Sequence, residues 1–264
     1  MIRLIASDLD GTLLLNDTQE LLPGTIDLIR ELRRQGRIFV PASGRQHSNL
    51  KRLFYPEKDL YYVCENGALT LKGDEILQQH LIERKLGEEI IHAILQQDGC
   101  EVLVSGVHTL YVQPKEPWFA VHLRDVVKND VTEVEDLLSV EEPYMKISIC
   151  QKDGIEKTEQ MWRRRFEGKV VPMISGNIWL DLMPFGADKG DGIALIQNRL
   201  HIMPEETMVF GDNFNDLAMF KRARYSFAME KAHSDVKKAC RYTTDMVEKI
   251  LIDVLDGKYD EGGN

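Results

Sequence analysis

Cysteine is scarce in this sequence, and the few cysteines present are widely separated. Only four occur among 264 residues, and no two stand close enough to form a Cys-x-x-Cys pair. The seven histidines include no His-Glu-x-x-His arrangement. Zinc sites normally use such closely spaced ligands. The sequence therefore argues against a zinc centre and indicates reduced, structural thiols.

Long apolar runs are also missing. No stretch approaches the roughly 18 apolar residues of a membrane-spanning helix. The N-terminal apolar run ends at Asp8, short of the roughly 7–15 residues at the core of a secretory signal. We therefore expect a cytoplasmic protein with no membrane partner.

Positive charge is in deficit as well. The chain has 33 Lys and Arg against 43 Asp and Glu, a formal net charge of -10. Because double-stranded nucleic acid is bound mainly through Lys and Arg, we expect no nucleic-acid partner. A local basic pocket for a small phosphate ester remains compatible with this charge. The composition fixes no oligomeric state, and a monomer is compatible with it.

Short apolar strands alternate with helices at both ends of the chain. The expected strands are residues 4–7, 38–40, 61–64 and 207–210. The expected helices run from Pro23 to a C-terminal Gly36 and over residues 46–54, 190–200 and 247–255. Apolar strands separated by helices predict a parallel sheet covered on both faces, an α/β fold with a Rossmann-like core. Segments 224–228 and 242–243 are expected to be edge strands.

The pattern changes between residues 81 and 184. Expected helices at 87–97 and 154–166 are interspersed with alternating strands at 100–104, 146–150 and 178–182. This pattern predicts an α+β domain inserted between the two segments of the core, residues 1–80 and 185–264. The polar end of the chain, residues 258–264, is expected to be disordered.

Polar side chains gather where the expected core strands end, and ligands of parallel sheets bind beyond those carboxyl ends. Phosphoryl transfer through a carboxylate needs a nucleophile, a divalent cation, an acid–base group and positive donors. The residues that could meet these needs are Asp8, Asp10, Ser43, Lys189, Asp212 and Asp216. Taken singly, each has an ordinary alternative as a turn residue, a helix cap or a surface charge.

Four motifs, in order, resemble those of the haloacid dehalogenase superfamily. They are Asp-Leu-Asp-Gly-Thr at 8–12, Ala-Ser-Gly-Arg at 42–45, Lys-Gly at 189–190 and Gly-Asp-Asn-Phe-Asn-Asp at 211–216. Their spread, with Glu-Asn-Gly-Ala at 65–68, is similar to the Cof-type branch, whose members hydrolyse sugar phosphates and related metabolites. The resemblance covers essentially the whole chain and implies that the insert is a cap domain.

The resemblance also implies a role for each motif residue. Asp8 would be the nucleophile, and Asp10 would act first as general acid and then as general base. The residues expected to hold Mg²⁺ are Asp8, Asp10 (through its carbonyl), Asp212 and Asp216. Those expected to bind the phosphoryl group are Ser43, Gly44, Lys189 and Asn215. Arg45 and Asn66 are candidates for contacts with the rest of the substrate.

The predicted function is therefore a magnesium-dependent phosphatase that hydrolyses a small phosphorylated metabolite through an aspartyl-phosphate. A phosphomutase of the same superfamily is an alternative, because it shares the first motif. A phospho-acceptor signalling domain also combines a parallel sheet with clustered aspartates. Asp10 argues against this last reading, because an acid–base group beside the nucleophile speeds loss of the phosphoryl group.

Overall fold

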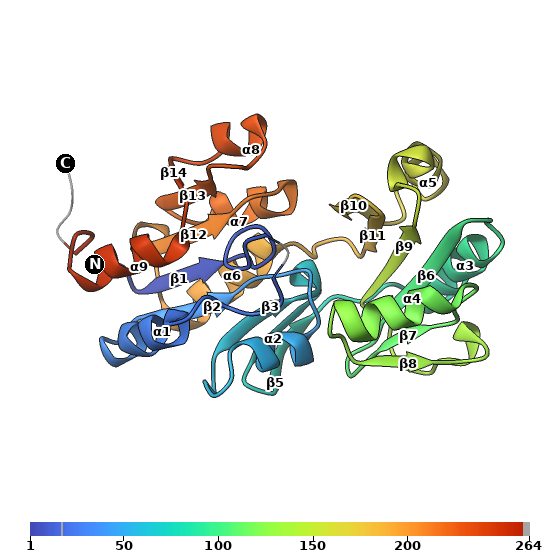
Figure 1. Cartoon of the computed structure of the whole chain (residues 1–264), viewed down its shortest axis with the longest axis horizontal. Helices are drawn as coiled ribbons and strands as arrows, with labels where there is room; N and C mark the ends of the chain where they lie inside the picture. The colour runs from blue at the N-terminus through green and yellow to red at the C-terminus, as the bar shows by residue number, and fades with distance from the viewer. Residues whose placement is uncertain (17, 261–264) are drawn as a thin grey trace. The chain divides into compact units, whose positions relative to one another are not determined.

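A computed structural model describes residues 1–16 and 18–260 of the chain. The fold consists of two units (Figure 1): Met1–Gln78 together with the chain from Asp188 onward, and Gln79–Ala187. The expected boundaries at 80/81 and 184/185 lie within three residues of these. No helix among the described residues is both long and apolar enough to cross a membrane.

The first unit is built on a five-stranded sheet in the order β14-β13-β12-β1-β2, with every neighbouring pair parallel. Its strands are β1 (Leu4–Ser7), β2 (Ile38–Pro41), β12 (Thr207–Gly211), β13 (Tyr225–Met229) and β14 (Tyr242–Thr244). Leu4 pairs with Thr207 on one side and with Ile38 on the other, so β1 is an interior strand of the sheet. The expected edge position of residues 224–228 is wrong, because β14 covers the outer side of β13.

The strand at 61–64 departs from the expected parallel sheet. β3 (Tyr61–Cys64) is joined to the end of β2 by a single parallel bridge between Ala42 and Val63. It then begins a separate three-stranded sheet, β3-β4-β5, with β4 (Leu69–Lys72) antiparallel to it and β5 (Glu75–Gln79) beyond. The sequence reading did not anticipate this sheet.

Helices close the apolar core of the first unit. They are α1 (Thr25–Arg34), α2 (His47–Leu53), α6 (Lys189–Leu200), α7 (Leu217–Phe220), α8 (Ser234–Lys238) and α9 (Val247–Leu255). α1 buries the face that carries Ile29 and Leu32, and Gly36 follows it with φ 79°, as its predicted C-terminal position requires. The apolar faces of α6, α7 and α8 pack on the sheet around Val40 and Val209.

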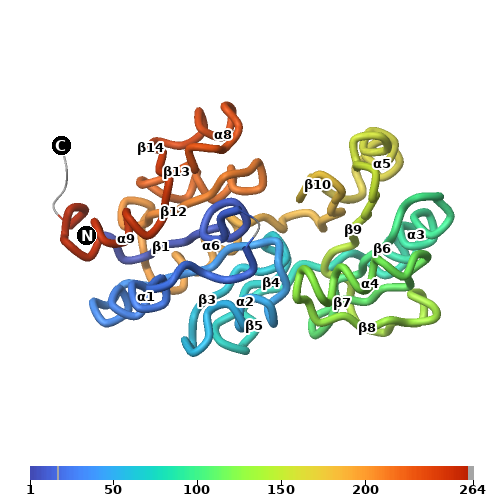
Figure 2. Tube along the Cα trace, in the orientation of Figure 1, coloured from blue at the N-terminus to red at the C-terminus, as the bar shows by residue number. Residues whose placement is uncertain are grey.

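The second unit has a six-stranded sheet in the order β10-β11-β9-β6-β7-β8. Figure 2 traces the path of the chain through it. Its strands are β6 (Cys100–Ser105), β7 (Leu110–Val112), β8 (Val131–Glu133), β9 (Lys146–Gln151), β10 (Val171–Gly176) and β11 (Trp179–Met183). Its helices are α3 (Arg84–Leu95), α4 (Pro117–Val121) and α5 (Glu159–Arg165). Helix α5 is shorter than the expected 154–166, because a separate 3₁₀ turn, Ile155–Lys157, precedes it. The predicted inserted α+β domain is thus present.

One core of this unit forms around α3, Trp162 and Phe166, and a smaller one around Phe119. Each unit therefore has apolar cores built from its own residues.

The end of the chain is more ordered than expected up to residue 260. The Arg37 guanidinium donates to both carboxylate oxygens of Asp260, at 2.9 and 2.8 Å, and the Tyr259 ring contacts Tyr225 edge-on. The expected disorder of residues 258–260 is therefore wrong. The rest of that expectation, residues 261–264, lies outside the described part of the chain.

Candidate active site

The predicted site residues of the first unit come together at one edge of the parallel sheet. Asp8 follows β1, Ser43 follows β2 and Asp212 follows β12, and these three strands are neighbours in the sheet. Because neighbouring parallel strands end at the same edge, residues some 200 positions apart in sequence meet there.

Lys189 lies at the centre of this edge. It is the first residue of α6, whose N-terminus is capped by the Asp188 side chain accepting from the Asp191 amide. Its Nζ donates to Asp8 Oδ1 and to Asp216 Oδ1, each at 2.7 Å, and its side chain is fully buried. Burial alone would lower the pKa of Lys189, but the charges of Asp216 and Asp8 outweigh it and raise that pKa. The ammonium therefore stays charged.

Asp216 is anchored inside the turn that follows β12. Its Oδ2 accepts from the amides of Asp212 and Asn213 at 2.9 and 3.0 Å. Gly211 makes room for it, because a Cβ there would lie 2.4 Å from Asp216 Oδ2. Both carboxylate oxygens of Asp216 thus already accept hydrogen bonds. This suits a residue that orients Lys189 and the turn more than one that reaches out to a ligand.

Asp8, Asp212 and Asp216 form an acidic group whose ligand atoms lie within 4.8 Å of one another. Asp212 also accepts from Thr12 Oγ1 at 3.1 Å. Burial raises the pKa of Asp8 well above its ordinary value; Lys189 opposes this, and the carboxylates of Asp216, Asp212 and Asp10 add to it. Burial, and then Asp216, likewise raise the pKa of Asp212. Three carboxylates against one ammonium form a site whose charge a cation would relieve.

Asp10 lies apart from this acidic group. Its side chain is 57% exposed and forms a two-pronged ion pair with Arg45, whose Nε donates to Asp10 Oδ2 at 2.8 Å. Arg45 is itself held by Gln19 Oε1 at 2.8 Å and Asn49 Oδ1 at 3.1 Å. Arg45, expected to contact substrate, thus orients Asp10 in this structure. The sequence reading missed Gln19 and Asn49, since neither belongs to a motif.

Ser43, Gly44, Asn66 and Asn215 form a second cluster beside the carboxylates. The Asn66 amide donates to the Ser43 carbonyl at 3.0 Å, and Asn215 Nδ2 donates to Asn66 Oδ1 at 3.0 Å. A Cβ at Gly44 would lie 3.0 Å from the Asn66 side chain, so a glycine permits this approach. Asn66 therefore contacts Ser43, Gly44 and Asn215, which the motifs predict to bind phosphate. In this structure it is a positioning residue for them.

Replacing Lys189 with Met should destabilise the metal-free protein by about 3–5 kcal/mol, because it strands the buried Asp8 and Asp216 carboxylates without their cation. Urea unfolding in EDTA measures this change. In the matched double variant Lys189→Met/Asp216→Asn, removing one of these charges should make the cost clearly smaller than the sum of the two single costs. A loss below about 1 kcal/mol in Lys189→Met, the range of an exposed ion pair, would contradict the view that the ammonium neutralises this site.

Comparison with known proteins shows several phosphatases that are similar to this chain. The 5-amino-6-(5-phospho-D-ribitylamino)uracil phosphatase YbjI of Escherichia coli K12 is 27% identical over 263 residues, covering 95% of this chain and 96% of that protein. The HMP-PP phosphatase of Serratia proteamaculans is 25% identical and covers 90% of this chain and 87% of its own. The solved sugar phosphatase BT4131, of HAD subclass IIB, has a TM-score of 0.81 with 23% identity and covers 98% of this chain and 99% of its own.

The last of these likenesses shows a shared fold and confirms the predicted fold class. The family of haloacid dehalogenase-like hydrolases matches residues 5–250, a span that includes all four motifs and the inserted domain. This match confirms the resemblance drawn from the motifs. The chain is therefore a phosphatase that belongs to the haloacid dehalogenase-like hydrolase family.

Proposed function

We propose that this phosphatase depends on Mg²⁺, forms an aspartyl-phosphate on Asp8 and hydrolyses a small phosphorylated metabolite. The observation that carries the proposal is the buried arrangement of Asp8, Lys189 and Asp216, in which one ammonium joins two carboxylates. A carboxylate fixed in this way can act as a nucleophile, while the ammonium neutralises the oxygens of an incoming phosphoryl group.

The donor set of the site fits magnesium. Hard carboxylate and carbonyl oxygens are the ligands that Mg²⁺ prefers, and the acidic group of Asp8, Asp212 and Asp216 offers them. Asp8, Asp212 and the Asp10 carbonyl would hold the ion, with Asp216 supporting them through Lys189 and the turn. When bound, the ion would neutralise charge on the transferred phosphoryl group.

The remaining residues have distinct tasks in this proposal. A carboxylate oxygen of Asp8 attacks phosphorus, and the bond from phosphorus to the ester oxygen breaks. Asp10, protonated and released from its ion pair with Arg45, gives that proton to the departing oxygen. Asp10 then takes a proton from the water that cleaves the acyl-phosphate, which releases phosphate and restores Asp8. Ser43 can donate to the phosphoryl group, because its Oγ accepts from the Arg45 amide and its own proton has no acceptor among the described residues.

The names of the relatives support a proposal for the substrate class. The two named by substrate act on a phosphorylated ribitylaminouracil and on HMP-PP, and BT4131 is described as a sugar phosphatase. We therefore propose a small organic phosphate, with a sugar phosphate as the leading candidate. We assign its selection to the Gln79–Ala187 unit, which has its own sheet and cores and would act as a closing cap.

A panel of phosphorylated metabolites tests this function through release of inorganic phosphate. Joining Gln78 to Asp188 by a short Gly-Ser linker should leave kcat/KM for p-nitrophenyl phosphate within about tenfold of the full chain's, because the chemistry resides in the first unit. Preferences among the metabolites should shrink to about tenfold or less. An unchanged preference would show that residues of the first unit select the substrate, with Arg45 and Asn66 as the first candidates.

The same panel separates this function from its alternative. A phosphomutase would return the phosphoryl group to another hydroxyl of the substrate and release little inorganic phosphate. Accumulation of an isomeric phosphate ester in place of free phosphate would therefore contradict the assignment.

A further inference from the structure

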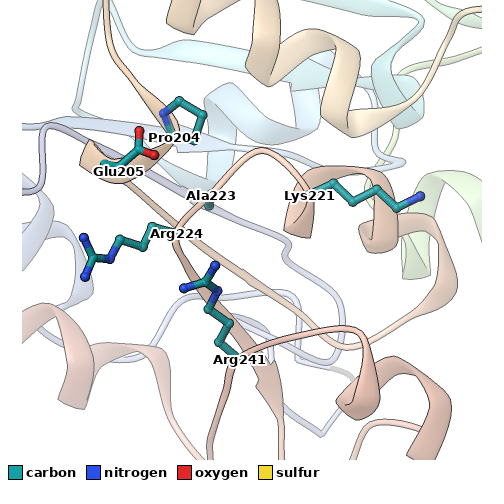
Figure 3. Close-up of a pocket in the computed structure, with 6 residues that line it drawn as sticks. All are labelled: Pro204, Glu205, Lys221, Ala223, Arg224 and Arg241. Atoms are coloured by element: carbon teal, nitrogen blue, oxygen red, sulfur yellow. The ribbon is translucent and has the colours of Figure 1, made fainter. Parts of the chain in front are cut away.

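A pocket lies at the amino ends of three strands of the parallel sheet, and Figure 3 shows the side chains that line it. Its volume is about 350 Å³, and its lining residues are Pro204, Glu205, Lys221, Ala223, Arg224 and Arg241. They lie in the segments that lead into β12, β13 and β14. Because these strands are parallel, the pocket is at their amino ends and Asp212 is beyond a carboxyl end. It is therefore distinct from the active site.

The side chains that line this pocket have a net positive charge, which is opposite in sign to the net charge of the chain. Three basic side chains and one carboxylate line it, whereas the chain as a whole has a net charge of -10. Within the part of the chain that the structure describes, neither the Lys221 ammonium nor the Arg241 guanidinium has an ion pair or hydrogen bond. A local excess of positive charge in a concave surface concentrates anions.

The backbone that carries these side chains is held in place. The Arg224 amide donates to the Pro204 carbonyl at 2.8 Å, and the Arg241 amide donates to the Ser226 carbonyl at 3.2 Å. The buried Gln197 side chain donates to the Arg222 carbonyl at 2.8 Å, which fixes the segment between Lys221 and Arg224. In Figure 3 the Arg241 guanidinium points toward the segment of Ala223 and Arg224. The backbone positions from which these side chains extend are therefore fixed before a ligand binds.

We propose that this pocket binds a small anion carrying two or more negative charges. Guanidinium groups match the oxygen geometry of phosphate and carboxylate alike, so either group can bear the charge. The pocket is large enough for a small metabolite and open to solvent through exposed Lys221 and Arg241. Glu205 faces the same space and limits the affinity.

Arginine side-chain signals in two-dimensional NMR test this directly, with pyrophosphate and citrate as probes. The titrations use the full chain in EDTA at constant ionic strength, so that screening does not change along them. The Nε signals of Arg224 and Arg241, assigned by their loss in Arg224→Gln and Arg241→Gln, should shift saturably with one shared Kd. Saturation by pyrophosphate alone would assign the site to phosphates, and saturation by citrate alone would assign it to carboxylates.

Two substitutions with opposite expected effects on the affinity provide a further test. Arg241→Gln should weaken binding, read at Arg224, by about tenfold or more, because it removes a charge-assisted contact. Glu205→Gln should tighten it. The matched control is Arg222→Gln, which removes the same charge from an exposed neighbour that does not line the pocket, and it should change Kd less than about twofold. Shifts that never saturate, or an equal effect of Arg222→Gln, would overturn the proposal.

Discussion

Replacing Asp8 with Asn should leave the protein folded and lower kcat by about 10⁴-fold or more, as loss of a principal catalytic group does in other enzymes. An amide oxygen is a poor nucleophile, and an amide lacks the negative charge with which the Asp8 carboxylate would attract a divalent cation. The fold should survive, because the backbone amide of residue 8 still donates to the Phe210 carbonyl, at 2.9 Å in the native protein. Lys189 can also still donate to the side-chain oxygen of the introduced Asn.

Steady-state kinetics with p-nitrophenyl phosphate measure this change, and urea unfolding checks the fold. Asp245→Asn is the matched control, because Asp245 is an exposed aspartate of the same unit that forms a surface ion pair with Lys249; it should keep full activity. Acid quenching of the native enzyme during turnover should place one phosphoryl group on the peptide that contains Asp8. Substantial activity in Asp8→Asn free of deamidated protein would sink the assignment.

Removal of divalent metal should abolish activity reversibly. A metal ion contributes several kcal/mol to stabilising a phosphoryl-transfer transition state, so chelation should lower kcat by about 10³-fold or more. Magnesium should restore the rate, whereas calcium should inhibit, because its looser coordination disturbs the alignment of attacking and leaving oxygens.

Binding of magnesium can be followed without activity. Because three carboxylates share this site with one ammonium, added Mg²⁺ should raise the Tm of the native protein. Asp212→Asn should lose most of this rise, while Asp245→Asn should retain it. Full activity after exhaustive dialysis against EDTA, or an equal rise in Tm for Asp212→Asn, would refute a magnesium site at this position.

The positions of the candidate catalytic residues could be predicted from the sequence because they depend on a regular feature of the fold. Asp8, Ser43 and Asp212 each follow a short apolar strand, and parallel neighbours place such residues at one edge. The ion pair between Arg45 and Asp10 could not be predicted this way. It depends on where a long side chain lies relative to Gln19 and Asn49, and that is decided by tertiary packing.

The differences between the expected and the observed strands have a similar cause. β7 and β8 were not predicted from the sequence, because they span three residues each, too few for an alternating pattern to stand out. β4 and β5 follow β3 as a meander, although the run of core strands and helices had suggested a continuing parallel sheet. Whether a strand lies at an edge also depends on its partners, which is why β13, covered by β14, was misplaced.

The pairing of β1 with β12 has a consequence for how the protein acquires activity during synthesis. Asp8 and Lys189 are 181 residues apart in sequence, so the catalytic edge cannot form until most of the chain has left the ribosome. Folding of the second unit shortens this separation, because it brings His80 near Gly186, where a Cβ would lie 3.4 Å from the imidazole. The cost of closing so long a loop then falls to that of a much shorter one. The inserted domain thus holds the two segments of the first unit close together in the nascent chain. Its folding should precede that of the sheet into which it is inserted.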